Sequence, residues 1–136
     1  MRKIVVLTLA AAIGALLATS VALAMRPPSQ VQVERTPAVR ILRVHPNPNT
    51  GCISLEQRIR GWTMYPSQIG DSVNQPGGGH YHIYVNGKYY TFGANATSAR
   101  ACGLAGGATY RLQVILAYDN HQEIGARSQV VTAVLR

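Results

Sequence analysis

Apolar and polar side chains alternate with a period of two along several stretches of this chain, a pattern typical of β-strands with one buried face. The stretch 52–62 places isoleucine and leucine side chains on one face and charged side chains on the other. The stretch 110–116 alternates in the same way. After residue 24, no segment has the helical period of an amphipathic helix. The alternation therefore predicts an all-β domain.

Seven candidate strands follow one another, with turn signals between them. They span residues 39–44, 52–62, 80–85, 88–92, 98–104, 110–116 and 128–135. Asn86-Gly87 favours a tight hairpin, because a type I′ turn needs a positive φ at both positions. Segment 45–49, with two prolines, predicts a turn, and 63–79 and 118–125 are expected to be loops. The pattern predicts an immunoglobulin-like antiparallel β-sandwich of about seven strands, with an eight-stranded barrel as the alternative.

The first 24 residues have the features of a signal peptide. Arg2 and Lys3 precede an apolar run over residues 4–17, and Ala22-Leu23-Ala24 matches a cleavage site. The run is shorter than the roughly 20 residues of a membrane span. We expect a signal peptide over 1–24, a flexible lead-in over 25–37 and a β-sandwich domain over 38–136. The mature protein would then be periplasmic or secreted and would have no transmembrane span. A retained N-terminal anchor is the alternative.

Cys52 and Cys102 are the two cysteines of the chain. In an exported protein, a single pair of cysteines predicts a disulfide bond. Two metal-bound thiolates are the alternative, but neither cysteine lies in a C-x-x-C motif.

The chain is basic, with a formal net charge of +8. Arginine, which supplies most of that charge, is a good donor to phosphates and carboxylates. Anionic partners such as lipopolysaccharide, lipid headgroups or nucleic acid are therefore candidates. The arginines are scattered along the sequence and form no dense basic run, which disfavours nucleic acid and favours simple solubility. An anionic envelope component or a protein subunit remains a candidate partner.

A His-x-His pair is the most unusual feature of the chain. His80, His82 and Tyr84 lie two residues apart on one predicted strand, so their side chains share one face. His121 lies in the loop after the strand 110–116. In an immunoglobulin-like order these two strands are neighbours, so we expect the three histidines to converge at one end of the sandwich. Three imidazoles are a typical ligand set for zinc or copper.

Four further residues are candidate auxiliaries of this metal site. Asp119 and Asn120 flank His121 and offer an oxygen ligand or a hydrogen bond to a ligand. Met64 is expected at the same end of the sandwich, and a thioether ligand would favour copper. Tyr84 follows His82 along its face. His45 is left out of the site.

The residues also leave two functions without a metal open. Five aromatic residues concentrate in the predicted hairpin 80–92, which suits an adhesive or structural module that binds a protein subunit or an envelope glycan. Alternatively, His121 and Asp119 would act as the base and orienting acid of a hydrolase, with Ser72 or Ser128 as nucleophile. No nucleophile-elbow motif surrounds either serine, so we do not expect an enzyme.

Several of these motifs together resemble a group of small exported bacterial domains of unknown function. They are Gly79–Gly87 (GHYHIYVNG), the Gly106-Gly107 turn before an alternating strand, and the loop Asp119–Gln122 (DNHQ). The resemblance extends from Trp62 to the C-terminus. It implies an immunoglobulin-type sandwich and a shared histidine pattern at His80, His82, Asn120 and His121, but no reaction. The cysteine pair is not part of the pattern.

Overall fold

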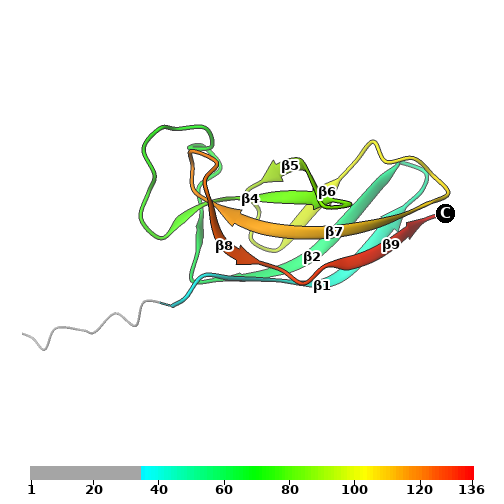
Figure 1. Ribbon diagram of the computed structural model, residues 1–136, viewed down its shortest axis with the longest axis horizontal. Helices are drawn as coiled ribbons and strands as arrows, with labels where there is room; N and C mark the ends of the chain where they lie inside the picture. The colour runs from blue at the N-terminus through cyan, green and yellow to red at the C-terminus, as the bar shows by residue number, and fades with distance from the viewer. Residues whose placement is uncertain (1–34) are drawn as a thin grey trace, which may run out of the picture. The chain divides into compact units, whose positions relative to one another are not determined.

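The computed structural model describes residues 35–136. The predicted signal peptide and most of the lead-in lie outside the described residues. Nine strands follow one another (Figure 1): β1 (Ala38–Asn47), β2 (Cys52–Arg60), β3 (Thr63–Met64), β4 (Gly78–Val85), β5 (Lys88–Gly93), β6 (Ser98–Ala101), β7 (Ala108–Ala117), β8 (Glu123–Arg127) and β9 (Val131–Leu135). Within the described residues no helix has the length and apolar character required to cross a membrane.

The strands form two sheets that pack as a sandwich. One sheet has the order β1-β2-β6. The other has β4 and β7 at its centre, with β3 and β5 pairing with β4, and with β8 and β9 pairing with β7. The all-β sandwich predicted from the alternation is confirmed, and the described strands do not close into the alternative barrel. Membership in the immunoglobulin-like class stays a prediction.

The core lies between the two sheets and follows the predicted alternation. Val39, Ile53 and Leu55 contribute to it from the three-stranded sheet, and Ile83 and Val114 from the larger one. Each side chain is buried, so the inward positions of the strands supply a continuous apolar layer. The opposite faces of the strands remain available for solvent or for a functional site.

The predicted β4–β5 hairpin is confirmed. Asn86 and Gly87 form its turn with φ values of 52° and 78°, so both positions are left-handed as a type I′ turn requires. The side-chain oxygen of Asn86 also accepts a hydrogen bond from the backbone N–H of Arg111, at 2.9 Å. This contact ties the turn to β7, which pairs with β4 on the side opposite β5.

The predicted turn at residues 45–49 begins too early. β1 continues through His45 and Pro46 to Asn47, and Pro46 is paired in register with Ile53. Proline is tolerated here because β1 is an edge strand of its sheet and its missing N–H interrupts no central ladder. The chain instead reverses over 48–51, where Gly51 has a φ of 62°.

The predicted loop 118–125 is also too long, because β8 begins at Glu123. The predicted strand 128–135 is β9, which begins three residues later, at Val131. β8 and β9 both pair with β7. They therefore form one edge of the sheet, and this edge is interrupted near Ser128. Together with the two-residue β3, this interruption raises the strand count from about seven to nine.

The predicted disulfide is confirmed between Cys52 and Cys102. Cys52 begins β2, and Cys102 follows the last residue of β6. Because Ile53 is paired with Ala101, the two cysteines meet where these neighbouring strands join their loops. The bond closes a loop with a sequence separation of 50 residues.

Candidate metal centre

β4 presents His80 and His82 on the outer face of the larger sheet. The intervening Tyr81 points into the core, so strand alternation directs both imidazoles the other way. Their partners on β7 are Ala117 and Ile115. Although this face lies outside the core, both histidines are buried, with His80 at 0% and His82 at 5% exposure.

His121 reaches the same place from the loop between β7 and β8. Its backbone N–H donates to the carbonyl of Tyr118 at 2.9 Å, within a tight turn. His121 has a φ of 67°, a left-handed conformation that costs a non-glycine residue energy and often marks a functional site. The predicted pairing of the two histidine-bearing segments holds, because β4 is hydrogen-bonded to β7.

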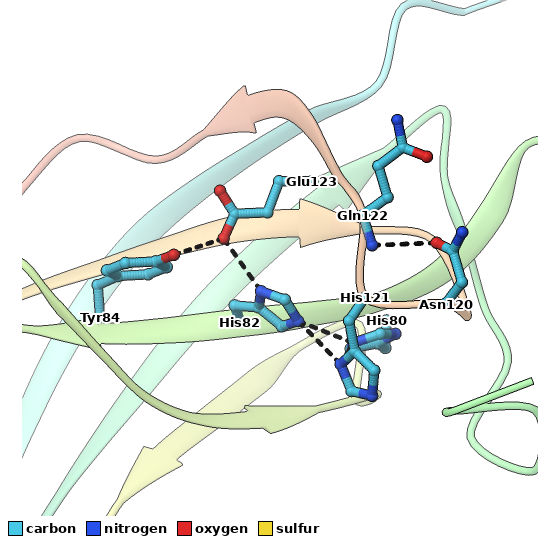
Figure 2. A network of polar contacts seen from close by, with 7 residues as sticks. All are labelled: His80, His82, Tyr84, Asn120, His121, Gln122 and Glu123. Atoms are coloured by element: carbon cyan, nitrogen blue, oxygen red, sulfur yellow. Dashed lines mark hydrogen bonds and ion pairs between the residues drawn. The ribbon is translucent and has the colours of Figure 1, made fainter.

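Three ring nitrogens, one from each histidine, meet at this point (Figure 2). His80 Nε2 lies 3.0 Å from His82 Nε2 and 3.1 Å from His121 Nδ1, and the last two atoms are 3.2 Å apart. Zinc–nitrogen bonds are about 2.0–2.1 Å long. Nitrogens at these separations can all lie at that distance from one ion, so the triangle fits a single metal.

Hydrogen bonds alone do not satisfy this triangle. A neutral imidazole has one N–H and one lone pair, and each ring contributes only one nitrogen to the cluster. A proton on one of the three leaves at least two lone pairs facing each other at close range. A cation at the centre would accept all three lone pairs at once, so the arrangement has the chemistry of a metal ligand set.

Glu123 determines which nitrogen of His82 faces the cluster. Its Oε1 lies 3.0 Å from His82 Nδ1 and accepts a hydrogen bond from the Tyr84 hydroxyl at 2.7 Å. A carboxylate only accepts, so Nδ1 carries the proton and Nε2 keeps its lone pair for the metal. Such a carboxylate–histidine pair is typical of metal sites. Figure 2 shows the chain of contacts from Tyr84 through Glu123 to His82.

Glu123 is the site residue that the sequence analysis missed. It lies on β8, two residues after His121, in a segment expected to be a loop. Burial alone would raise the pKa of its carboxyl group, but the hydrogen bonds from Tyr84 and His82 outweigh burial and lower that pKa. The carboxylate is therefore ionised at neutral pH. The same contact with Glu123 raises the pKa of the Tyr84 phenol, which keeps its proton and donates it.

His80 is held in its neutral form. Burial first, and then repulsion from His82 and His121, lower the pKa of His80 to about 4, against an opposing effect of Asp119. At neutral pH its lone pair is consequently free for a metal. Its second ring nitrogen, Nδ1, is buried and has no hydrogen-bond partner within the described residues.

The other predicted auxiliaries have different places. Asp119 is fully buried, and its Oδ2 accepts the backbone N–H of Gln75 at 3.1 Å, which joins two loops. Asn120 accepts the backbone N–H of Gln122 through its side chain at 3.0 Å and so shapes the loop of His121. Met64 lies beside Gly79 in register, and its side chain packs against the hydrophobic core.

Aromatic rings from β5 border the cluster. The Phe92 ring lies edge-on to His80 and His121, with centroids 5.8 and 5.6 Å away. The Tyr89 ring lies 5.0 Å from that of His82. These rings shield part of the site while His121 remains exposed. A metal ion held here would thus have two buried ligands, His80 and His82, and it would enter from solvent on the side of the exposed His121.

Of the two serines considered as a hydrolase nucleophile, Ser128 is engaged in structural hydrogen bonds, whereas Ser72 lies on a loop. Ser128 is buried; its hydroxyl accepts the backbone N–H of Val114 at 3.0 Å and donates to the carbonyl of Gln129 at 2.8 Å. Ser72 lies exposed in the loop between β3 and β4. His45 is exposed on β1 and is paired with Ser54 on β2, in the three-stranded sheet that does not carry the histidine cluster.

Comparison of the chain with family models, curated protein sequences and solved structures finds no significant match. The family resemblance remains a prediction, and the functional conclusion is drawn from the geometry of the histidines.

Proposed function

We propose that this protein is an exported metal-binding domain that holds one divalent transition-metal ion through His80, His82 and His121. The convergence of their three ring nitrogens within 3.0–3.2 Å of one another is the observation that carries the proposal. Glu123 orients His82, β4 positions His80, and the loop between β7 and β8 positions His121.

The ligand set favours Cu²⁺ and then Zn²⁺. Imidazoles suit both ions, and affinities for such sites rise along the divalent series to copper and fall at zinc. A thioether contribution from Met64 is not needed for this preference. Because only three protein ligands are present in the cluster, a fourth position would be filled by water or by a group from another molecule, as in zinc sites with three histidines.

Export is part of the proposal. The N-terminal pattern of charged, apolar and small residues predicts it, and the Cys52–Cys102 bond suits an oxidising compartment. We propose binding, transport or storage rather than catalysis: Ser128 is engaged in structural hydrogen bonds, and no nucleophile-elbow motif surrounds either Ser72 or Ser128.

The second candidate is an adhesive module that needs no metal. β5 carries three exposed aromatic side chains, Tyr89, Tyr90 and Phe92, with exposures of 49%, 40% and 47%. β5 pairs only with β4 among the described strands, so it offers a free edge to a partner. Under this alternative, chelators would leave partner binding unchanged and Tyr90→Ser would weaken it.

Titration of the tag-free protein with Cu²⁺ and Zn²⁺ tests the leading proposal. We expect one ion per chain and an affinity that His82→Ala reduces at least about 100-fold, since two remaining imidazoles make a poor site. His45→Ala is the matched control, because His45 is exposed and lies on the other sheet. Equal affinities for the wild type and His82→Ala would refute the proposal.

A further inference from the structure

The arginines that are scattered in the sequence gather on the outer face of the three-stranded sheet. Arg40 on β1 is paired in register with Arg58 on β2, and Arg60 is paired with Ala38. Their neighbours along the strands, Val39 and Gln57, are buried, and Ile59 packs against the core, so strand alternation directs the three arginines outward. All three are exposed. Figure 1 shows β1 and β2 side by side along this sheet.

No acidic side chain among the described residues 35–136 forms an ion pair with this cluster of positive charge. Like charges directly opposite each other on paired strands are destabilising. The ion pairs among residues 35–136 are Arg43–Glu56 and His82–Glu123, so Arg40, Arg58 and Arg60 have no acidic partner there. Glu56 is the neighbouring acid on this face, and Arg43 engages it at 3.2 Å. The sheet therefore maintains a local repulsion that a bound anion would relieve.

The arginines surround a surface hollow of about 220 Å³. Its lining consists of Arg40, Arg58 and Arg60 together with Ala38, Val39 and Leu42. The hollow is thus lined by three arginines and three apolar residues. Planar guanidinium groups match the oxygens of phosphate in paired hydrogen bonds. A doubly charged oxyanion complements three such groups better than a single carboxylate does.

We propose that Arg40, Arg58 and Arg60 form a binding site for a phosphate group. This site is separate from the metal centre, because it lies on the other sheet of the sandwich. Two sources carry the same chemistry: inorganic phosphate, and the phosphomonoester headgroup of an anionic lipid. The exposed side chain of Leu42 adds an apolar contact that would suit the lipid.

The test is a titration of the metal-free, tag-free full-length chain with inorganic phosphate, monitored by calorimetry and by the midpoint of thermal unfolding. We expect saturable binding and a rise in that midpoint for the wild type. Arg58→Gln should weaken binding about 10- to 100-fold, since it removes charge-assisted hydrogen bonds from the centre of the cluster. Arg111→Gln is the matched control: an exposed arginine on the other sheet, which should bind phosphate like the wild type.

A second measurement separates a binding defect from a folding defect. Without phosphate, Arg58→Gln should unfold at the same temperature as the wild type or higher, because the repulsion with Arg40 is removed. No saturable phosphate binding by the wild type, or equal binding by Arg58→Gln, would overturn the proposal. Vesicles of phosphatidylcholine with and without phosphatidate then distinguish the sources. Binding to phosphatidate vesicles that Arg58→Gln abolishes identifies a lipid headgroup, and phosphate binding without vesicle binding identifies the free ion.

Discussion

The carboxylate of Glu123 lies 3.0 Å from His82 Nδ1, on the side of the imidazole opposite the histidine cluster. This relationship fixes the tautomer of His82 and directs the lone pair of Nε2 toward His80 and His121. Tyr84, from the same strand as His82, holds the carboxylate in place. The site therefore contains its own support for one ligand, which a chance meeting of surface histidines would lack.

Glu123→Ala should lower the affinity for Cu²⁺ or Zn²⁺ about 10- to 100-fold while the stoichiometry stays at one ion per chain. The loss is expected because His82 would no longer be held in the required tautomer and orientation. Tyr84→Phe should cause a smaller loss, since it removes only one hydrogen bond to the carboxylate. Glu56→Ala, an acid on the other sheet, is the control in the same titration. An unchanged affinity for Glu123→Ala would show that the carboxylate does not act on the site.

The stability of the metal-free protein should fall as the pH drops from about 6.5 toward 4. His80 has a pKa of about 4 in the folded protein, against 6.5 for an ordinary histidine. Between pH 4 and 6.5, His80 is protonated in the unfolded chain but neutral in the folded protein, so lowering the pH favours unfolding. Above pH 6.5, His80 is neutral in both states and does not contribute to the pH dependence. The loss is on the order of 3 kcal/mol when the pH reaches 4.

Urea denaturation at several pH values measures this effect. Other groups titrate in the same range, so the decisive quantity is the difference between the wild type and His80→Leu, whose stability should depend less on pH. His45→Leu removes an exposed histidine and should keep the wild-type dependence. If His80→Leu and the wild type lose the same stability as the pH falls, a buried neutral His80 is not the cause of the pH dependence.

Gly79→Ala should destabilise the start of β4 and weaken metal binding with it. Gly79 has a φ of 154°, and a Cβ there would lie 2.2 Å from the carbonyl oxygen of Ala117 on β7. The clash would separate the two strands beside His80, at an expected cost of about 2 kcal/mol or more. Gly77→Ala is the control: its φ of 69° is also left-handed, but its Cβ would meet nothing within 4 Å. Equal stabilities of the two variants in urea would contradict this account.

Removal of the disulfide should lower the stability of the fold without removing the metal site. The bond closes a loop of 50 residues, which corresponds to about 4 kcal/mol on the chain-entropy model. It joins β2 to the end of β6 in the three-stranded sheet, whereas the histidines belong to the other sheet. In calorimetry, Cys52→Ser/Cys102→Ser should unfold at a lower temperature, and at room temperature its folded fraction should bind the ion with wild-type affinity. Loss of metal binding by a folded double variant would contradict this prediction, because it would show that the geometry of the histidine cluster depends on the disulfide in the other sheet.

The sequence predicted the part of the site that rests on strand periodicity. Alternation placed His80 and His82 on the face opposite Tyr81, and Asn86-Gly87 located the hairpin that follows. The approach of His121 could be expected from the strand order of an immunoglobulin-like sandwich, in which the strand of His80 and His82 lies next to the strand that precedes His121. The hairpin turn and the alternation of side chains along a strand are strong local signals.

Glu123 and the full length of β1 lacked such a signal. The segment Glu123–Arg127 contains Gly125 and has no fully buried residue, so its pattern resembles that of a polar loop. Tertiary pairing with β7, rather than local propensity, makes it a strand. Pro46 in turn suggested a break in β1, and only the edge position of that strand makes the proline acceptable. The grouping of Arg40 with Arg58 likewise depends on register, which sequence spacing did not reveal.

The central claim is that three imidazoles share one metal ion. The most direct test is the metal affinity of the tag-free wild type compared with His80→Ala/His82→Ala, with Cu²⁺ and Zn²⁺ titrated separately. The account predicts tight one-to-one binding by the wild type, the tighter ion being Cu²⁺, and no specific binding by the double variant. Weak binding by the wild type, or binding that survives the double substitution, would contradict it.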